Sequence, residues 1–401
     1  MLEPTIEGPG ASPRPGARTR LRAAGAVAAV AAAALVAACA PPPGPPAPPG
    51  PPVITRFFAS TQRTEAPVLA ALGWTISDPN AGDVLRCRVD TDGDGSFDEE
   101  LAPCRSTDSL LSEFDTAGTR TLTLEVSDGV FDPVVATTDV QVTAGPSEDY
   151  EITLRIDPGM RQEFRDAFES AADRWAEAIV AGVPDQFLDL AAINLFGFPP
   201  FSGVVDDVLI DARDVAIDGP GKVLGRAGGF AIREGNWQPY YGIMEFDTAD
   251  LEQLLASGRL GDVILHEMGH VLGLGANWLL TGSITGFPTD PHYTGRAGVA
   301  AHQELGGARY VPVENEGGLG TVFAHWREAT FNNELMTGYL DQGSNPMSRL
   351  TIAALSDQGY GVDLGAADAY ALPSLSAARA TGSEVPLHTE PIEPVVIGPV
   401  E

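Results

Sequence analysis

One short segment combines two histidines and a glutamate at a spacing that can bind a metal ion. It reads His266-Glu267-Met-Gly-His270. On a helix, residues four positions apart lie on one face, about one turn from each other. Two imidazoles so placed can share a zinc ion, and Glu267 beside them can take a proton from a water at that ion. Apolar neighbours predict a buried helix, where three polar side chains are costly unless they are paired or metal-bound.

A zinc site of this kind needs a third protein ligand. In the metzincin pattern His-Glu-x-x-His-x-x-Gly-x-x-His the third histidine would be residue 276, which here is Ala276. The third ligand must therefore come from farther along the chain. The remaining histidines are His292, His302, His325 and His388. The last of these lies in a proline-rich tail, which disfavours it, whereas His292 and His302 lie in a glycine-rich stretch and stay candidates.

The surroundings of His325 are the most specific. The segment Phe323-Ala-His325-Trp-Arg-Glu-Ala-Thr-Phe-Asn-Asn-Glu-Leu-Met336 resembles the leishmanolysin family of zinc metalloproteases. In that family an insertion separates the second and third ligands, and Trp and then Glu-Leu-Met follow the third. The similarity covers roughly Tyr150 to Asp363, over half of the chain.

The resemblance implies a role for each matching residue. One catalytic zinc ion would be bound by His266, His270 and His325. Glu267 would be the general base that activates a water, and Met336 would form the Met-turn beneath the metal. The implied activity is that of a metalloendopeptidase that hydrolyses peptide bonds of extracellular proteins.

Some individual roles have alternatives. Tyr339, just past the Met-turn, is a candidate donor to the oxyanion, against a packing role. In a gluzincin the third ligand would instead be a downstream glutamate, here Glu314, Glu328 or Glu334. Eukaryotic members of the leishmanolysin family are rich in cysteine in this domain and keep the zinc latent with a propeptide cysteine. This domain has no cysteine, so we expect that latency mechanism to be absent.

Periodicity indicates the elements that must position these residues. Apolar side chains recur every three or four positions from about Met160 to Ala181, which predicts an amphipathic helix. Gly273 directly follows the metal-binding helix and predicts a turn with positive φ. The alternating run Tyr241–Phe246 is our candidate edge strand for an extended substrate, with an interior strand as the alternative. We expect residues 146–370 to form an α+β metzincin-type catalytic domain with a mixed sheet, an active-site helix and a Met-turn.

A different pattern precedes this domain. Short alternating runs separated by turn signals fill residues 53–145 and predict an all-β sandwich. The segments around Trp74 and Leu122–Gly129 resemble a PKD or immunoglobulin-like module. This module also contains a segment that resembles the first nine positions of an EF-hand calcium loop, with candidate calcium ligands at Asp90, Asp92, Asp94, Ser96 and Asp98.

The twelfth position of such a loop would be Leu101 rather than the usual Glu. A solvated acidic turn is therefore the alternative to calcium binding.

The N-terminus has the features of an export signal. Arginines precede an apolar run that ends in Leu35-Val-Ala-Ala-Cys39. This stretch resembles a bacterial lipobox, which predicts removal of residues 1–38 and acylation of Cys39, with an ordinary signal peptide or short anchor as the alternative. Residues 39–52 are rich in Pro, Gly and Ala and predict an extended tether. We therefore expect a lipid-anchored protein of the bacterial cell envelope, facing outward or periplasmic.

The remaining two cysteines are Cys87 and Cys104. An exported chain favours a disulfide between them, and two buried thiols are the alternative.

The charge balance restricts the partners. The 401 residues include 24 basic and 55 acidic side chains, for a net charge of −31. This acidity argues against nucleic acid or anionic lipid headgroups as a main partner. Protein or peptide substrates are what the family resemblance implies, and the membrane would be reached through the lipid anchor at Cys39. A catalytically inactive surface adhesin that uses the β-sandwich is the alternative function. We expect residues 371–401 to be a flexible C-terminal tail.

Overall fold

The structure, a computed structural model, describes residues 48–146, 148–190, 197–318, 320–341, 343–373, 385–387 and 389–392. The predicted signal, Cys39 and most of the tether and tail lie outside the described residues. Within the described part, no helix is long and apolar enough to cross a membrane.

The first folded region is a β-sandwich of two antiparallel sheets. One sheet has the order β1-β2-β5, formed by β1 (Val53–Ser60), β2 (Val68–Ser77) and β5 (Ser109–Phe114). The other has the order β4-β3-β6-β7, formed by β3 (Arg86–Asp90), β4 (Glu99–Leu101), β6 (Gly118–Ser127) and β7 (Val134–Val142). Alternate residues of β6 face the core, where Leu122, Leu124 and Val126 are fully buried. A disulfide joins Cys87 and Cys104 beside this core, with their Cα atoms 5.6 Å apart.

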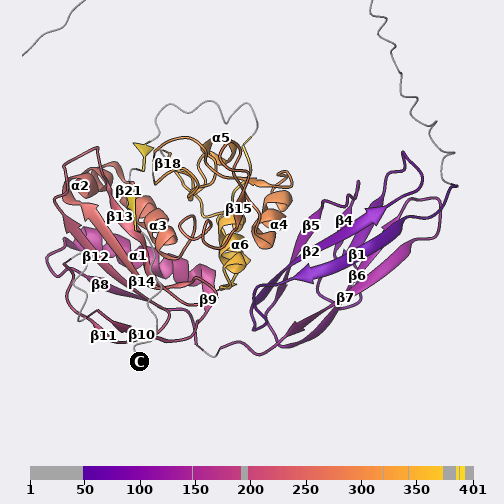
Figure 1. Cartoon of the computed structure of the whole chain (residues 1–401), viewed down its shortest axis with the longest axis horizontal. Coiled ribbons are helices and arrows are strands. Elements are labelled where there is room, and N and C mark those ends of the chain that lie inside the picture. The colour runs from indigo at the N-terminus through magenta and orange to yellow at the C-terminus, as the bar shows by residue number, and fades with distance from the viewer. Residues whose placement is uncertain are drawn as a thin grey trace, which may run out of the picture. The chain divides into compact units, whose positions relative to one another are not determined.

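The second region is built on a five-stranded mixed sheet of order β21-β13-β14-β12-β8. Its strands are β8 (Ile152–Ile156), β12 (Val208–Val215), β13 (Gly225–Ile232), β14 (Pro239–Asp247) and β21 (Thr389–Pro391). β8, β12 and β14 are parallel, and β13 runs antiparallel to β14. Figure 1 shows the helices α1 (Gln162–Ala178), α2 (Thr248–Ser257) and α3 (Leu260–Val271) next to this sheet. The predicted layout, an all-β module followed by an α+β domain, is confirmed.

The structure corrects our candidate edge strand. Tyr241–Phe246 belongs to β14, which lies between β13 and β12 in the interior of the sheet. All nine residues of β14 are buried, because the strand is covered on both faces, so its alternating pattern did not mark a solvent-facing edge. The antiparallel β13 is the next strand outward, and β21 pairs only with its residues 225–227.

The part of the chain after α3 forms short elements. Its helices are α4 (Arg296–Glu304), α5 (Glu328–Phe331), α6 (Arg349–Asp357) and the 3-10 turn η1 (Leu364–Ala366). Its strands are β15 (Ile284–Thr285), β16 (His292–Tyr293), β17 (Val311–Pro312), β18 (Tyr339–Leu340), β19 (Gly361–Val362) and β20 (Val385–Pro386). Earlier short strands are β9 (Ile179–Ala181), paired with β19, and β10 (Gln186–Asp189) with β11 (Ser202–Val205).

Two segments of the C-terminal tail are part of the folded region. β20 pairs with β18, and β21 pairs with β13 at the end of the large sheet. We expected a flexible tail over these residues, because the sequence there shows little periodicity. Strands of two or three residues are too short to give a periodic signal.

The two regions are joined at α4. Gln303 donates through Nε2 to the carbonyl oxygen of Thr107 at 2.8 Å, and the backbone N–H of Leu111 donates to Glu304 at 3.1 Å. Leu69 of β2 also belongs to the apolar core of the second region.

Candidate active site

The three predicted ligand histidines converge on one point. The Nε2 atoms of His266 and His270 are 3.1 Å apart, and that of His325 lies 3.1 Å from the first and 3.0 Å from the second. Three nitrogens on one tetrahedral zinc ion, each about 2.05 Å from it, would be about 3.3 Å apart. All three imidazoles are buried. The arrangement therefore matches the protein ligand set of a catalytic zinc ion.

The other ring nitrogens explain why a cation fits between these histidines. Each Nδ1 lies within hydrogen-bond distance of a main-chain carbonyl oxygen: His266 of Leu335 at 2.6 Å, His270 of Leu274 at 2.8 Å and His325 of Thr321 at 2.9 Å. A carbonyl oxygen only accepts, so each Nδ1 carries the proton and each Nε2 presents a lone pair. Three lone pairs that face one another cannot satisfy each other, whereas a shared cation satisfies all three.

Burial keeps these imidazoles neutral. Removal from water lowers the pKa of His270 to about 4 and that of His325 to about 3. It also lowers the pKa of His266 well below its usual value, and the neighbouring imidazoles lower it further. Neutral imidazole is the form that binds a metal ion. The ligands therefore need to lose no proton at neutral pH.

Glu267 follows the first ligand on the same helix. Its side chain is fully buried, as are those of the flanking helix residues Ile264 and Met268. A carboxylate held inside a buried helix, one position from a metal ligand, is suited to accept a proton from a reacting water. The structure thus places Glu267 and two of the three histidines, His266 and His270, on one helix.

The ligand-bearing helix packs closely against Met336 and Trp175. A Cβ atom at Gly269 would lie 2.9 Å from the Sδ atom of Met336 and 2.9 Å from the Trp175 ring. Any side chain larger than hydrogen at this position would therefore displace one of them. Trp175 also donates from Nε1 to the carbonyl oxygen of Leu265 at 2.9 Å, which fixes α1 against α3. Met336 thus lies against α3, within one turn of both helical ligands.

A buried carboxylate holds the turn that contains Met336. Glu334 Oε2 accepts the backbone N–H of Met336 at 2.7 Å. Its Oε1 accepts the hydroxyls of Ser348 and Thr351, each at 2.6 Å. Since the carbonyl oxygen of Leu335 accepts from His266, this network sets the orientation of a ligand. We did not predict it from the sequence, although a glutamate in an apolar string signals that buried partners are required.

Gly273 ends the helix in the predicted way. Its φ is +103°, and a Cβ there would lie 2.5 Å from Gln358 Oε1. The backbone N–H of Leu274 donates back to the carbonyl oxygen of Gly269 at 3.0 Å. This C-terminal turn directs the carbonyl oxygen of Leu274 toward His270.

The other candidate ligands lie elsewhere. His292 lies 2.9 Å from the hydroxyl of Thr285, and His302 on α4 packs against Phe331 of α5. Glu314 accepts backbone N–H groups of its own loop and of Glu328, and the carboxylate of Glu334 is used by the Met336 turn. His388 lies outside the described residues. The histidine set that the structure brings together is the one implied by the family resemblance.

Tyr339 lies in β18, three residues after Met336, and is half-buried. Thr337 donates its hydroxyl to the carbonyl oxygen of Tyr339 at 2.9 Å, so the backbone at this position is tied to the turn. Its role as an oxyanion donor stays a prediction.

The acidic loop of the β-sandwich folds around one carboxylate. Side-chain oxygens of Asp90, Asp92 and Asp94 lie within 4.8 Å of one another. Asp90 accepts the backbone N–H groups of Gly93 and Gly95, at 2.7 and 3.0 Å. The two other candidate calcium ligands, Ser96 and Asp98, make different contacts. Asp98 accepts hydrogen bonds from the backbone N–H and the hydroxyl of Thr91, and the backbone N–H of Ser96 donates to Asp94. Calcium binding by this loop stays a prediction.

Three buried histidines around one point, with a buried glutamate on the helix that carries two of them, are typical of a metallopeptidase site. Comparison with known proteins shows which family resembles this part of the chain. The leishmanolysin peptidase family matches residues 233–377, which include all three histidines, Glu267 and Met336. Over these residues, just over a third of the chain, the protein is similar to the leishmanolysin peptidase family.

The similarity to individual relatives is local. The leishmanolysin-like peptidase of Caenorhabditis briggsae is 51% identical over 49 residues, 12% of this chain and 7% of that protein. The Drosophila melanogaster leishmanolysin-like peptidase is 35% identical over 86 residues, 21% of this chain and 12% of the relative. The chain thus matches only a small share of the length of these relatives.

Two solved structures are similar to about a quarter of the chain. One is the PKD1 domain of Epp from Vibrio anguillarum, 22% identical with a TM-score of 0.19, covering 24% of this chain and 99% of that one. The other is the PKD domain of an M14-like peptidase from a Thermoplasmatales archaeon, 21% identical with a TM-score of 0.20, covering 24% and 98%.

Proposed function

We propose that this protein is a zinc-dependent endopeptidase that cleaves proteins outside the cell. The observation that carries the proposal is the convergence of three buried Nε2 lone pairs, each fixed by a carbonyl oxygen at Nδ1. A zinc ion held there would supply a Lewis acid that makes water a nucleophile at neutral pH and polarises the scissile carbonyl. The inactive-adhesin alternative gains no support from this site.

The side chains of the site have separate tasks in this proposal. The three histidines hold a neutral, oriented ligand set. Glu267 accepts a proton from the attacking water and passes it to the departing amine. Tyr339 donates to the developing oxyanion. Met336 and the Glu334 network keep the ligand-bearing helix in place.

Substitution of Glu267 and His325 separates metal binding from catalysis. We expect Glu267→Gln to retain zinc but to lose casein cleavage by a factor of about 10² or more, because proton transfer is removed. His325→Ala should lose zinc, measured by metal analysis after gel filtration, and activity with it. His292→Ala is the matched control, since this histidine lies outside the site, and should keep both. A wild-type protein that holds one zinc ion yet cleaves neither casein nor a peptide library would overturn the enzyme proposal.

We also propose that the protein is anchored to a membrane by acylation of Cys39. The lipobox-like sequence and the Pro-rich stretch after it support this proposal. Cys39→Ala should move the protein from the membrane to the soluble fraction of cells and abolish labelling with radioactive palmitate. Unchanged fractionation of this variant would reject the anchor without affecting the peptidase proposal.

A further inference from the structure

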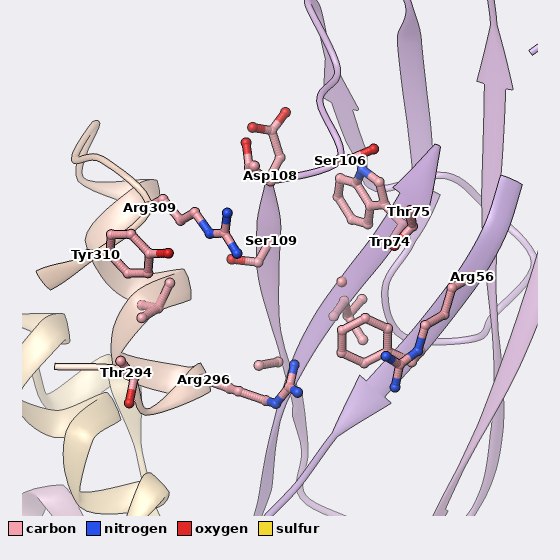
Figure 2. Close-up of a pocket in the computed structure, with 16 residues that line it drawn as sticks. Arg56, Trp74, Thr75, Ser106, Asp108, Ser109, Thr294, Arg296, Arg309 and Tyr310 are labelled. Carbon is pink, nitrogen blue, oxygen red and sulfur yellow. The ribbon is translucent and has the colours of Figure 1, made fainter. Parts of the chain in front are cut away.

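A pocket of about 550 Å³ lies where the β-sandwich and α4 meet, and three arginines line it. Arg56 comes from β1, Arg296 begins α4, and Arg309 precedes β17. In Figure 2, Arg296 and Arg309 extend from the catalytic region toward the sandwich, and Arg56 extends from the sandwich. None of the zinc-site residues described above lines this pocket.

The pocket is a local exception to the charge of the protein. The chain has a net charge of −31. In the part of the chain that the structure describes, ten arginines form ion pairs, and these three pair with no described carboxylate. Asp108 also lines the pocket, where it accepts the backbone N–H of Arg105 at 2.7 Å. The lining charge is therefore 3 − 1 = +2.

Two of the arginines stack on one aromatic ring. The guanidinium carbons of Arg56 and Arg296 lie 4.2 and 5.0 Å from the centre of the Phe58 ring. This ring lies over Gly73 of β2, where a Cβ would come within 2.6 Å of it. The strand pair therefore holds the ring in place, and the ring holds two cations near each other. Like charges repel, so a bound anion would stabilise this arrangement.

The side chains indicate the class of anion. Planar guanidinium groups pair with carboxylates through two parallel hydrogen bonds. Tyr310 is 44% exposed, and the centre of its ring lies 5.2 Å from the guanidinium carbon of Arg309, so it adds an apolar surface. A long polyanion, such as a nucleic acid or a sulfated glycan, would be repelled by the acidic remainder of the protein. A short acidic peptide segment brings few charges and can place them at the arginines.

We propose that this pocket binds an acidic segment of the protein substrate, away from the scissile bond, and so selects substrates. The inference rests on the proposed peptidase function. It predicts that substrates are recognised at two places, at the zinc site by the residues around the cleaved bond and at the pocket by Asp or Glu side chains.

Direct binding tests this pocket independently of cleavage. The full-length Glu267→Gln protein is titrated with a fluorescent peptide that carries three glutamates, and with the same peptide in which these are glutamines. We expect the glutamate peptide to bind at least tenfold more tightly at low salt, with a preference that weakens as salt increases. Replacing Arg296 and Arg309 by glutamine should remove the preference. Arg86→Gln, which changes an exposed arginine on another part of the sandwich, should keep it.

Charge reversal gives a second, stricter outcome. Arg296→Glu with Arg309→Glu should make a lysine peptide bind more tightly than the glutamate peptide. Equal binding of the glutamate and glutamine peptides, an unchanged preference in the double glutamine variant, or tighter binding of a sulfated glycan would each overturn the proposal. Acidic-peptide binding in a protein that cleaves no substrate would reject the peptidase function but not the pocket. In active protein, the ratio of kcat/KM for substrates with and without an acidic extension should fall to about one in the double glutamine variant.

Discussion

At the scale of single residues, the site depends on which nitrogen of each imidazole carries its proton. The carbonyl oxygens of Leu335, Leu274 and Thr321 fix this choice, and burial keeps the rings neutral. The first of these carbonyl groups belongs to the turn that Glu334 holds. A residue that touches no metal can therefore control a metal ligand.

Glu334→Gln tests this control. A glutamine presents an NH2 group where the carboxylate accepted hydrogen bonds, so buried donors lose their partners. We expect the free energy of unfolding to fall by about 2 kcal/mol in urea, and zinc affinity, measured by chelator competition, to fall about 10-fold or more. The matched control is Glu316→Gln, because Glu316 is exposed. If the Glu334 variant matched the control in both measurements, the network would have no role in the site.

At the scale of elements, α3 is fixed on one side by α1 and on another by the Met336 turn. Gly269 makes this close packing feasible, because Met336 and Trp175 occupy the volume that a side chain would need. The same helix contains a second glycine, Gly261, where a Cβ would meet no atom within 4 Å. An alanine at Gly261 therefore changes helix propensity alone, whereas an alanine at Gly269 changes both helix propensity and packing.

The two glycines should respond in opposite directions to alanine. Gly261→Ala should raise the free energy of unfolding by up to about 1 kcal/mol, because alanine favours the helix. Gly269→Ala gains the same propensity but must displace Met336 or Trp175, so we expect a net loss of about 1–3 kcal/mol and weaker zinc binding. Urea unfolding and zinc titration of both variants decide this. A stabilised Gly269→Ala protein that binds zinc normally would contradict the packing we describe.

Local spacing predicts some elements better than others. The positions of His266 and His270 on one helix follow from a four-residue spacing, and the helix near Met160 follows from its apolar period. His325 lies 55 residues from His270, so its place in the site came from the family resemblance and not from any local pattern. The carbonyl partners could not be predicted, because every residue has a carbonyl oxygen and only tertiary packing chooses among them. The edge strand was assigned wrongly because alternation occurs in buried strands as well.

At the scale of the whole molecule, buried titratable groups link stability to pH. His302 on α4 is 2% exposed, and burial lowers its pKa to about 4. In the unfolded chain its pKa is about 6.5. Between these values the unfolded state binds a proton that the folded state does not, so stability is lost as the pH falls through this window.

His302→Gln should reduce the sensitivity to acid. In metal-free protein between pH 7 and pH 5, the wild type should lose about 2 kcal/mol more of its free energy of unfolding than the variant does. Urea unfolding at the two pH values measures the difference, and any constant cost of the substitution cancels. Identical losses in both proteins would show that His302 is protonated in the folded state at pH 5.

The hydrogen bonds from the three histidines to main-chain carbonyl groups have a consequence for how this protein can change over evolutionary time. A side-chain partner can be deleted by one codon change, but a main-chain carbonyl is present whatever amino acid is encoded. A substitution at Leu335, Leu274 or Thr321 that the core tolerates therefore leaves in place the acceptor that orients the imidazole. The orientation of the three imidazoles thus depends on the course of the main chain and not on the identity of three further side chains.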